Sequence, residues 1–253
     1  MTTKVTAALL IVAAVLANLA FTALGSIFDY PDVLDEPASD VLASFREHEG
    51  AVSAWFTVLA SFRAHEGAVS AWFAVLALAA ALLAPIAIGV GRLSSARAMR
   101  IAVRVGVAAA AVQVVGLLRW PILVPGYAAD AANPSAAVAA AARDSFTTAS
   151  DILGTAIGET LGYLLTATWT ALVVVALARG FAGRWFVALG AVSAALVLVG
   201  VLSPLGLPVI DTANFLGYVL WSVWLIAFGV LVVVRERRAG ASEAATRRAP
   251  VTS

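Results

Sequence analysis

The side chains that could do chemistry inside an apolar segment are one arginine and one glutamate. Arg119 lies in the stretch GLLRWPILVP, and Glu159 lies in AIGETLGYLLTATWT. An ionised side chain within a bilayer is costly, and it usually finds a partner or water. We therefore expect Arg119 and Glu159 to form a buried ion pair. Such a pair either orders the helices that carry it or borders a polar pocket in which Glu159 binds a cation or proton and Arg119 an anion.

Further polar side chains accompany Glu159 at helical spacing. They recur at steps of three or four residues, which places them on one face of a helix that should look into a bundle rather than into lipid. The members of this stripe are Thr155, Glu159, Tyr163, Thr166 and Thr170.

Two weak internal echoes extend this pattern to a second pair of segments. LGYLLTATW (residues 161–169) matches LGYVLWSVW (residues 216–224), so that Asn214 aligns with Glu159 and Tyr218 with Tyr163. VGLLRWPILVP (residues 115–125) similarly matches VGVLSPLGLP (residues 199–208). Transporters often contain such repeats, although repeats also serve as plain scaffolding. If a pocket exists, we expect it to be lined by Tyr163, Thr166, Asn214 and Tyr218.

The composition excludes a soluble protein. The chain is 62% hydrophobic and only 12% charged, whereas charged residues make up about a quarter of a typical soluble domain. The apolar residues fall in long blocks, which is typical of several transmembrane helices. We expect an all-α, polytopic membrane helix bundle.

Six apolar runs are long enough to be spans. They are expected at residues 5–28, 67–90, 101–124, 152–178, 185–202 and 215–234. Residues 1–235 then form a single membrane domain. The remainder, residues 236–253, is basic and rich in small residues, which predicts a disordered tail.

A near-identical 17-residue duplication occupies residues 41–77. VLASFREHEGAVSAWFTVLA is followed by VLASFRAHEGAVSAWFAVLA. The first copy offers too few apolar residues before charges interrupt it to cross a core about 30 Å thick. We place the first copy on the outer membrane surface or in an extended helical hairpin, and the second span begins near Gly67.

The distribution of charge predicts the orientation. Twelve Lys and Arg residues gather on the side of the two termini, beside two acids, whereas twelve acids and three arginines lie on the other side. Because cytoplasmic loops carry the excess of Lys and Arg, both termini should be inside, in the plasma membrane. The third and fourth spans are then antiparallel, and a rise of 1.5 Å per residue puts Arg119 and Glu159 at one depth, about 10 Å below the outer surface.

No catalytic, metal or cofactor motif accompanies these residues. The chain has no cysteine, so thiolate metal sites and cysteine nucleophiles are excluded. The pairs His48-Glu49 and His65-Glu66 come from one copied unit and lack the spacing of a zinc protease motif. No pair of acids, Ser-His arrangement or phosphate-binding glycine loop stands beside the polar stripe. We expect no catalytic residues, no metal and no cofactor.

Three segments resemble a family of bacterial multi-span membrane proteins that is common in high-GC actinobacteria and classed as a domain of unknown function. They are FDYPDVL after the first span, GLLRWPILVP and AIGETLGYLLTATWT. The resemblance extends over residues 6–235 and implies a plasma-membrane location, but no activity. The duplication departs from the single copy that the resemblance implies.

Three functional readings follow. The first is a non-catalytic membrane scaffold, sensor or partner subunit; the second is a transporter of a small solute or ion with an outward-facing pocket around Glu159; the third is an intramembrane enzyme. The expected partner is the lipid bilayer, and the arginines of the tail are candidates for contact with anionic head groups. The tail has too few charges and no aromatic residues, so nucleic-acid binding is not expected.

Overall fold

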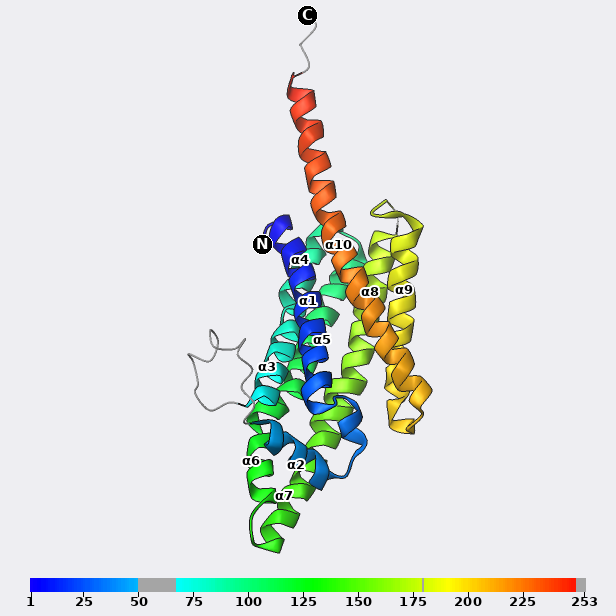
Figure 1. Ribbon diagram of the computed structural model, residues 1–253. Coiled ribbons are helices and arrows are strands. Elements are labelled where there is room, and N and C mark those ends of the chain that lie inside the picture. Colours follow the sequence, from blue (N-terminus) through cyan, green and yellow to red (C-terminus); the bar gives the residue numbers. More distant parts are fainter. Residues whose placement is uncertain (50–66, 179, 249–253) are drawn as a thin grey trace, which may run out of the picture.

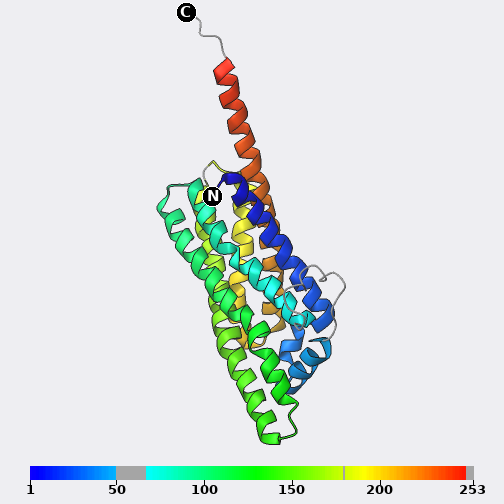
Figure 2. The same cartoon turned by 90° about the vertical axis from the view of Figure 1, so that its left-hand side faces the viewer.

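The computed structural model describes residues 1–49, 67–178 and 180–248. Within these residues every regular element is a helix, and six helical segments are long and apolar enough to cross a membrane. They pack into one bundle with the two chain termini at the same end (Figures 1 and 2). We call this the terminal end and the opposite end the connector end. The prediction of an all-α bundle with six spans is confirmed.

Each expected span overlaps one of these segments, with ends that extend at most one residue beyond it. The segments are α1 (Thr3–Phe28), α3 (Ala68–Ala81) with α4 (Leu83–Val90), α5 (Arg97–Ile122) with α6 (Val124–Ala131), α7 (Ala136–Ala149) with η5 (Ser150–Leu161) and α8 (Gly162–Leu177), α9 (Gly183–Val199) with η6 (Gly200–Leu205), and α10 (Pro208–Arg248). The remaining elements are η1 (Asp32–Asp35), α2 (Ala38–Glu49) and η4 (Gly91–Leu93).

Prolines determine where several segments bend or begin. The second span bends at Leu82, because Pro85 has no N–H to donate to the carbonyl of Ala81 one turn earlier. The last helix starts at Pro208, seven residues before the expected start of the sixth span. Proline suits the first helical position, where its missing N–H would have no helical partner.

The connector between the expected third and fourth spans, residues 125–151, is a helical hairpin. The helix of the third span continues to Ala131, and the next helix begins at Ala136. In the turn between them, the backbone N–H of Ser135 donates to Oδ1 of Asn133 at 3.0 Å. The two helical segments contain 35 and 42 residues, which is about 50 Å or more of helix against a core of roughly 30 Å. The hairpin therefore extends beyond the other helices at the connector end (Figure 1).

The first part of the C-terminal segment continues the last helix, and the disorder expected for residues 236–253 stays a prediction. Helix α10 continues past the sixth span as far as Arg248 and projects from the terminal end (Figure 2). Residues 236–248 are rich in Ala, Arg and Glu, which favour helix. Residues 249–253 lie outside the described part of the chain.

The duplication contributes one half of each copy to the described structure. Helix α2 comes from the first half of copy one, and its Val41, Leu42 and Phe45 are buried. Helix α3 comes from the second half of copy two, and it packs against α2. The other two halves form residues 50–66, which lie outside the described residues and have the length of one repeat. The structure therefore places only the α2 part of the first copy, and this part lies at the connector end.

Removal of one repeat should leave the bundle intact. Deletion of residues 41–57 joins Asp40 to Val58 and restores the sequence VLASFRAHEGAVSAWF, which can supply both α2 and α3. We expect wild-type membrane insertion and helical content, measured by membrane extraction and circular dichroism. As a control, deletion of residues 41–63 removes the VLASFR segment of both copies, so the buried face of α2 cannot form and stability should fall. Loss of insertion in the in-phase deletion would show that the extra copy is structural.

Candidate functional site

The third and fourth spans approach most closely at two glycines. A Cβ on Gly116 would lie 2.6 Å from the Cα of Gly158, and a Cβ on Gly158 would lie 3.1 Å from the Cα of Gly116. Only hydrogen at both positions permits this backbone contact, as in other membrane helix pairs that meet at small residues. The contact brings the stripe on the fourth span directly against α5.

Arg119 lies against the next glycine along this interface. Its side chain is 7% exposed, and a Cβ on Gly154 would meet the guanidinium at 2.7 Å from Nη2. Nη1 donates to the carbonyl of Gly116 at 2.7 Å, while Nε has no hydrogen-bond partner. The guanidinium carbon also lies 5.4 Å from the ring centroid of Trp120. Arg119 is therefore a buried cation with unused donors.

Arg119 and Glu159 lie on two helical segments that pack against each other, α5 and η5. Arg119 is level with Gly154, and Gly116 is level with Gly158. The two charges interact electrostatically, but within the described residues they make no direct ion pair. We expected the two charges to lie at equal depth because we assumed a loop between the third and fourth spans. Instead, the helix of the third span continues to Ala131, and the next helix begins at Ala136. The pairing of Arg119 with Glu159 stays a prediction.

The helix that carries Glu159 has unusual geometry. Residues Ser150–Leu161 form a π-helix of 12 residues between the α-helices α7 and α8. π-Helical turns are rare and are often found at functional sites. The wider turn changes the angular position of every side chain that follows it. Glu159 and Tyr163 therefore point in directions that differ from those in a regular α-helix.

Tyr30 and Asp211 contribute to the field around Glu159. Tyr30, from the FDYPDVL segment, is half-buried and packs its ring 5.2 Å from that of Phe73. Burial, with a smaller contribution from the Glu159 carboxylate, raises the pKa of Tyr30 to about 12. Its hydroxyl is consequently protonated at neutral pH. Asp211, in the first turn of α10, adds a second negative charge that acts on Glu159.

Hydrogen bonds connect three helices on the terminal side of Glu159. Nε2 of Gln113 donates to Oγ1 of Thr166 at 2.8 Å, which links α5 to α8. Trp221 Nε1 donates to Oγ1 of Thr170 at 2.8 Å, which links α10 to α8. Thr170 in turn donates to the carbonyl of Thr166 at 2.9 Å. Gln113 and Arg119 of the third span therefore both contact the fourth span.

The predicted pocket residues gather in the same region. The rings of Tyr163 and Tyr218 meet edge to face at 5.8 Å between centroids. Nδ2 of Asn214 donates to the carbonyl of Val197 at 2.9 Å. Asn214 and Tyr163 also pack on Gly200, where a Cβ would collide with both side chains. These contacts occupy the side chains with one another. Admission of a solute among them stays a prediction.

We define the polar layer as the polar side chains at this level of the bundle interior. Its members are Gln113, Arg119, Glu159, Tyr163, Thr166, Thr170, Asn214 and Tyr218.

Aromatic clusters border the polar layer at both ends. At the connector end, Trp120 is fully buried among aromatic rings, one of which, Phe73, stacks on it at 4.5 Å. At the terminal end, Trp169 and Trp224 meet at 6.0 Å, and Trp224 stacks on Phe186. The connector-end cluster comprises Phe28, Phe45, Phe73, Trp120 and Phe146, and the terminal-end cluster comprises Trp169, Phe181, Phe186, Trp224 and Phe228.

The structure contains the same glycine–tryptophan contact in both echoed hairpins. A Cβ on Gly106 would lie 2.6 Å from the Trp169 ring, and a Cβ on Gly190 would lie 2.7 Å from the Trp224 ring. The echoes align these glycines and these tryptophans with each other. The hairpin of α5 with η5 and α8 therefore has a counterpart in the hairpin of α9 with α10, which runs in the same direction (Figure 1).

The counterpart hairpin lacks the charges. The same alignment places Ser203 opposite Arg119 and Asn214 opposite Glu159. The second hairpin thus has neutral polar side chains where the first has a cation and a carboxylate. A charged pair occurs at these aligned positions in one hairpin only, so the packing that the two hairpins share does not require it.

Comparison with known proteins identifies the class. The six-helix architecture and the buried polar layer are those of an integral membrane protein. The sequence profile of the family described as "Domain of unknown function (DUF4386)" matches residues 5–229, so the chain belongs to that family. Searches of curated proteins and of solved structures found no match. The three segments that carried the resemblance supply Tyr30, Arg119 and Glu159 to one place in the structure.

Sequence reasoning missed Gln113 as a partner of the fourth span, Tyr30 as a neighbour of Glu159, and the π-helix. Gly116 and Gly158 were available as a signal, because small residues at the centres of two consecutive spans favour close contact. No pattern in the sequence predicted the π-helix.

Substitution of Gly116 should destabilise the bundle. A Cβ there meets backbone atoms of Leu153 and Gly158, which cannot rotate away, so Gly116→Ala should cost about 1–3 kcal/mol of unfolding free energy. Gly126→Ala is the matched control, because a Cβ at Gly126 meets nothing within 4 Å. Unfolding of the purified protein in detergent measures both. Equal stability of the two variants would contradict the close contact.

Proposed function

We propose that this protein is a non-catalytic integral membrane scaffold, sensor or partner subunit, in which the polar layer fixes the arrangement of the helices. The observation that carries the proposal is that the layer is satisfied internally on its terminal side. Gln113, Thr166, Thr170 and Trp221 form a connected series of hydrogen bonds across three helices. Internal polar bonds of this kind specify which helices meet and in what register.

The terminal-end cluster supports a closed bundle. Trp169, Phe186, Trp224 and Phe228 have no exposed surface, and their rings contact one another at centroid distances of 5.2–6.0 Å. A hydrated route from Glu159 to the terminal end would have to separate these rings. That separation loses buried aromatic area and ring–ring contact, which are among the larger packing terms in a protein interior.

We further propose that the chain lies in the plasma membrane of a bacterium with both termini in the cytoplasm. The excess of Lys and Arg at the terminal end supports this orientation. Arg235 donates to the carbonyl of Gly180 and lies over the ring of Phe181, so it is held at the rim of the bundle. The exposed Arg237 and Arg238 follow it, where they can reach anionic head groups. Because the chain has no cysteine, labelling of one cysteine placed at Asn133 tests the orientation.

A second candidate function is transport of a small solute or ion. The observation that favours it is Glu159 itself, which is half-buried on a π-helix, has no direct ion pair in the described residues, and shares its surroundings with Tyr163 and Asp211. Transporter sites are typically formed where spanning helices depart from regular geometry near the middle of the membrane. In this reading Glu159 is the group that binds the cation or proton.

Flux measurements separate the two candidates. The wild-type protein and Glu159→Gln are reconstituted in liposomes and assayed for proton, sodium, potassium and chloride flux. Because the terminal-end cluster closes the interior, we expect both proteins to match empty liposomes. Asp144→Asn, which alters an exposed carboxylate, is the matched control. Ion flux in wild type and Asp144→Asn that disappears in Glu159→Gln would contradict the scaffold proposal and establish the transporter.

A further inference from the structure

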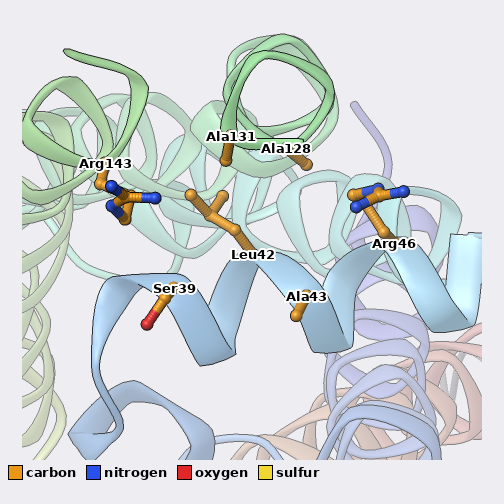
Figure 3. A pocket seen from close by; sticks show the side chains of 7 residues that line it. All are labelled: Ser39, Leu42, Ala43, Arg46, Ala128, Ala131 and Arg143. Carbon is orange, nitrogen blue, oxygen red and sulfur yellow. The ribbon is translucent and has the colours of Figure 1, made fainter. Parts of the chain in front are cut away.

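A small cavity lies at the connector end, away from the polar layer. It is formed where α2 packs beside the helical hairpin of α6 and α7, and it has a volume of about 80 Å³. Figure 3 shows Leu42 of α2 opposite Ala128 and Ala131 of α6, with an arginine at either side. The cavity is far smaller than the roughly 300–1,000 Å³ of a site for an organic substrate. Its volume corresponds to about two or three water molecules, which suits a compact anion.

Two arginines from different helices border this cavity. Arg46 comes from the last turn of α2, and Arg143 comes from the middle of α7, with its head group directed toward Leu42 (Figure 3). Within the described residues neither guanidinium has a hydrogen bond or an ion pair to the protein. Arg46 also complements the dipole of α2 at its C-terminal end, but that effect does not account for Arg143.

The arginines stand out against the charge of their surroundings. Among the described residues the connector side carries eleven acids and only these two arginines, yet none of those acids forms an ion pair with either arginine. The hydroxyl of Ser39, which also lines the cavity, donates to Asp40 at 3.1 Å. The available donors are thus those of the two guanidiniums, whose planar arrangement of N–H groups matches phosphate oxygens.

The position of the cavity fits a phosphate at the membrane surface. Ala128 and Ala131 lie on the part of the hairpin that follows the third span. There the 35-residue helical segment is longer than the apolar core is thick, so this part of the helix lies at the membrane surface. We propose that Arg46 and Arg143 form a binding site for a phosphate group, supplied by the phosphodiester of an anionic lipid head group or by free phosphate. The site does not depend on whether the polar layer conducts.

Ligand-dependent unfolding of the full-length protein in a neutral detergent tests the site. The probes are phosphatidylglycerol, inorganic phosphate and diacylglycerol, which lacks the phosphate, and the shift of the thermal midpoint with concentration gives an apparent affinity. We expect saturable stabilisation by phosphatidylglycerol, by phosphate or by both, and none by diacylglycerol. Stabilisation by phosphatidylglycerol alone identifies a lipid as the source, and stabilisation by phosphate identifies the free anion as sufficient.

Variants locate the site. The double variant Arg46→Gln with Arg143→Gln should lose at least about tenfold in apparent affinity, because it removes both charge-assisted donors. The matched control Arg97→Gln with Arg104→Gln alters two exposed arginines at the terminal end and should change affinity by less than about twofold. Ala131→Leu fills the cavity without changing charge and should weaken binding as the arginine variant does.

Three results would overturn the proposal. Equal stabilisation by diacylglycerol and phosphatidylglycerol would remove the role of phosphate. Equal loss in the two arginine pairs would indicate general charge attraction rather than a site. Wild-type affinity in Ala131→Leu would place the ligand outside the cavity, and this variant decides the question even if the double arginine variant fails to fold.

Discussion

The structure depends on the burial of one guanidinium in the apolar part of the bundle. Arg119 is always ionised at accessible pH, and its 7% exposed side chain makes one hydrogen bond, to the carbonyl of Gly116. A buried charge that is not balanced costs several kcal/mol. The surrounding helices meet this requirement by bringing the Glu159 carboxylate close enough to interact electrostatically and by placing the Trp120 ring alongside. Glycines at positions 116, 154 and 158 provide the space, so the charge and the close helix contact require each other.

The internal repeat clarifies what the charge adds. Both hairpins use a glycine to seat a tryptophan, and the two tryptophans meet inside the terminal-end cluster. At the aligned positions the first hairpin has Arg119 and Glu159, whereas the second has Ser203 and Asn214. The neutral hairpin packs through Asn214 on the carbonyl of Val197. The second hairpin thus packs without charged side chains at these positions, and Arg119 and Glu159 distinguish one side of the bundle.

The sequence alone could predict six spans, because blocks of apolar residues report directly on burial in lipid. It also predicted that the segments of Arg119 and Glu159 are neighbours. It could not predict their axial register. The polar composition of residues 127–151 suggested a loop, whereas helix continues to Ala131 and from Ala136, and the π-helix shifts Glu159 further. Tyr30 lies too far away in sequence for any local pattern to link it to Glu159.

The most direct test of this account is a double-mutant cycle on Arg119→Met and Glu159→Leu, with the unfolding free energy of each variant measured in detergent. If the two charges balance each other, each single variant is destabilised. The double variant is then more stable than the sum of the two single effects predicts, with a coupling energy of about 1 kcal/mol or more. Effects that add to within about 0.5 kcal/mol would mean that the charges are independent. Arg119 would then be stabilised by Gly116 and Trp120 alone, and Glu159 would have another purpose.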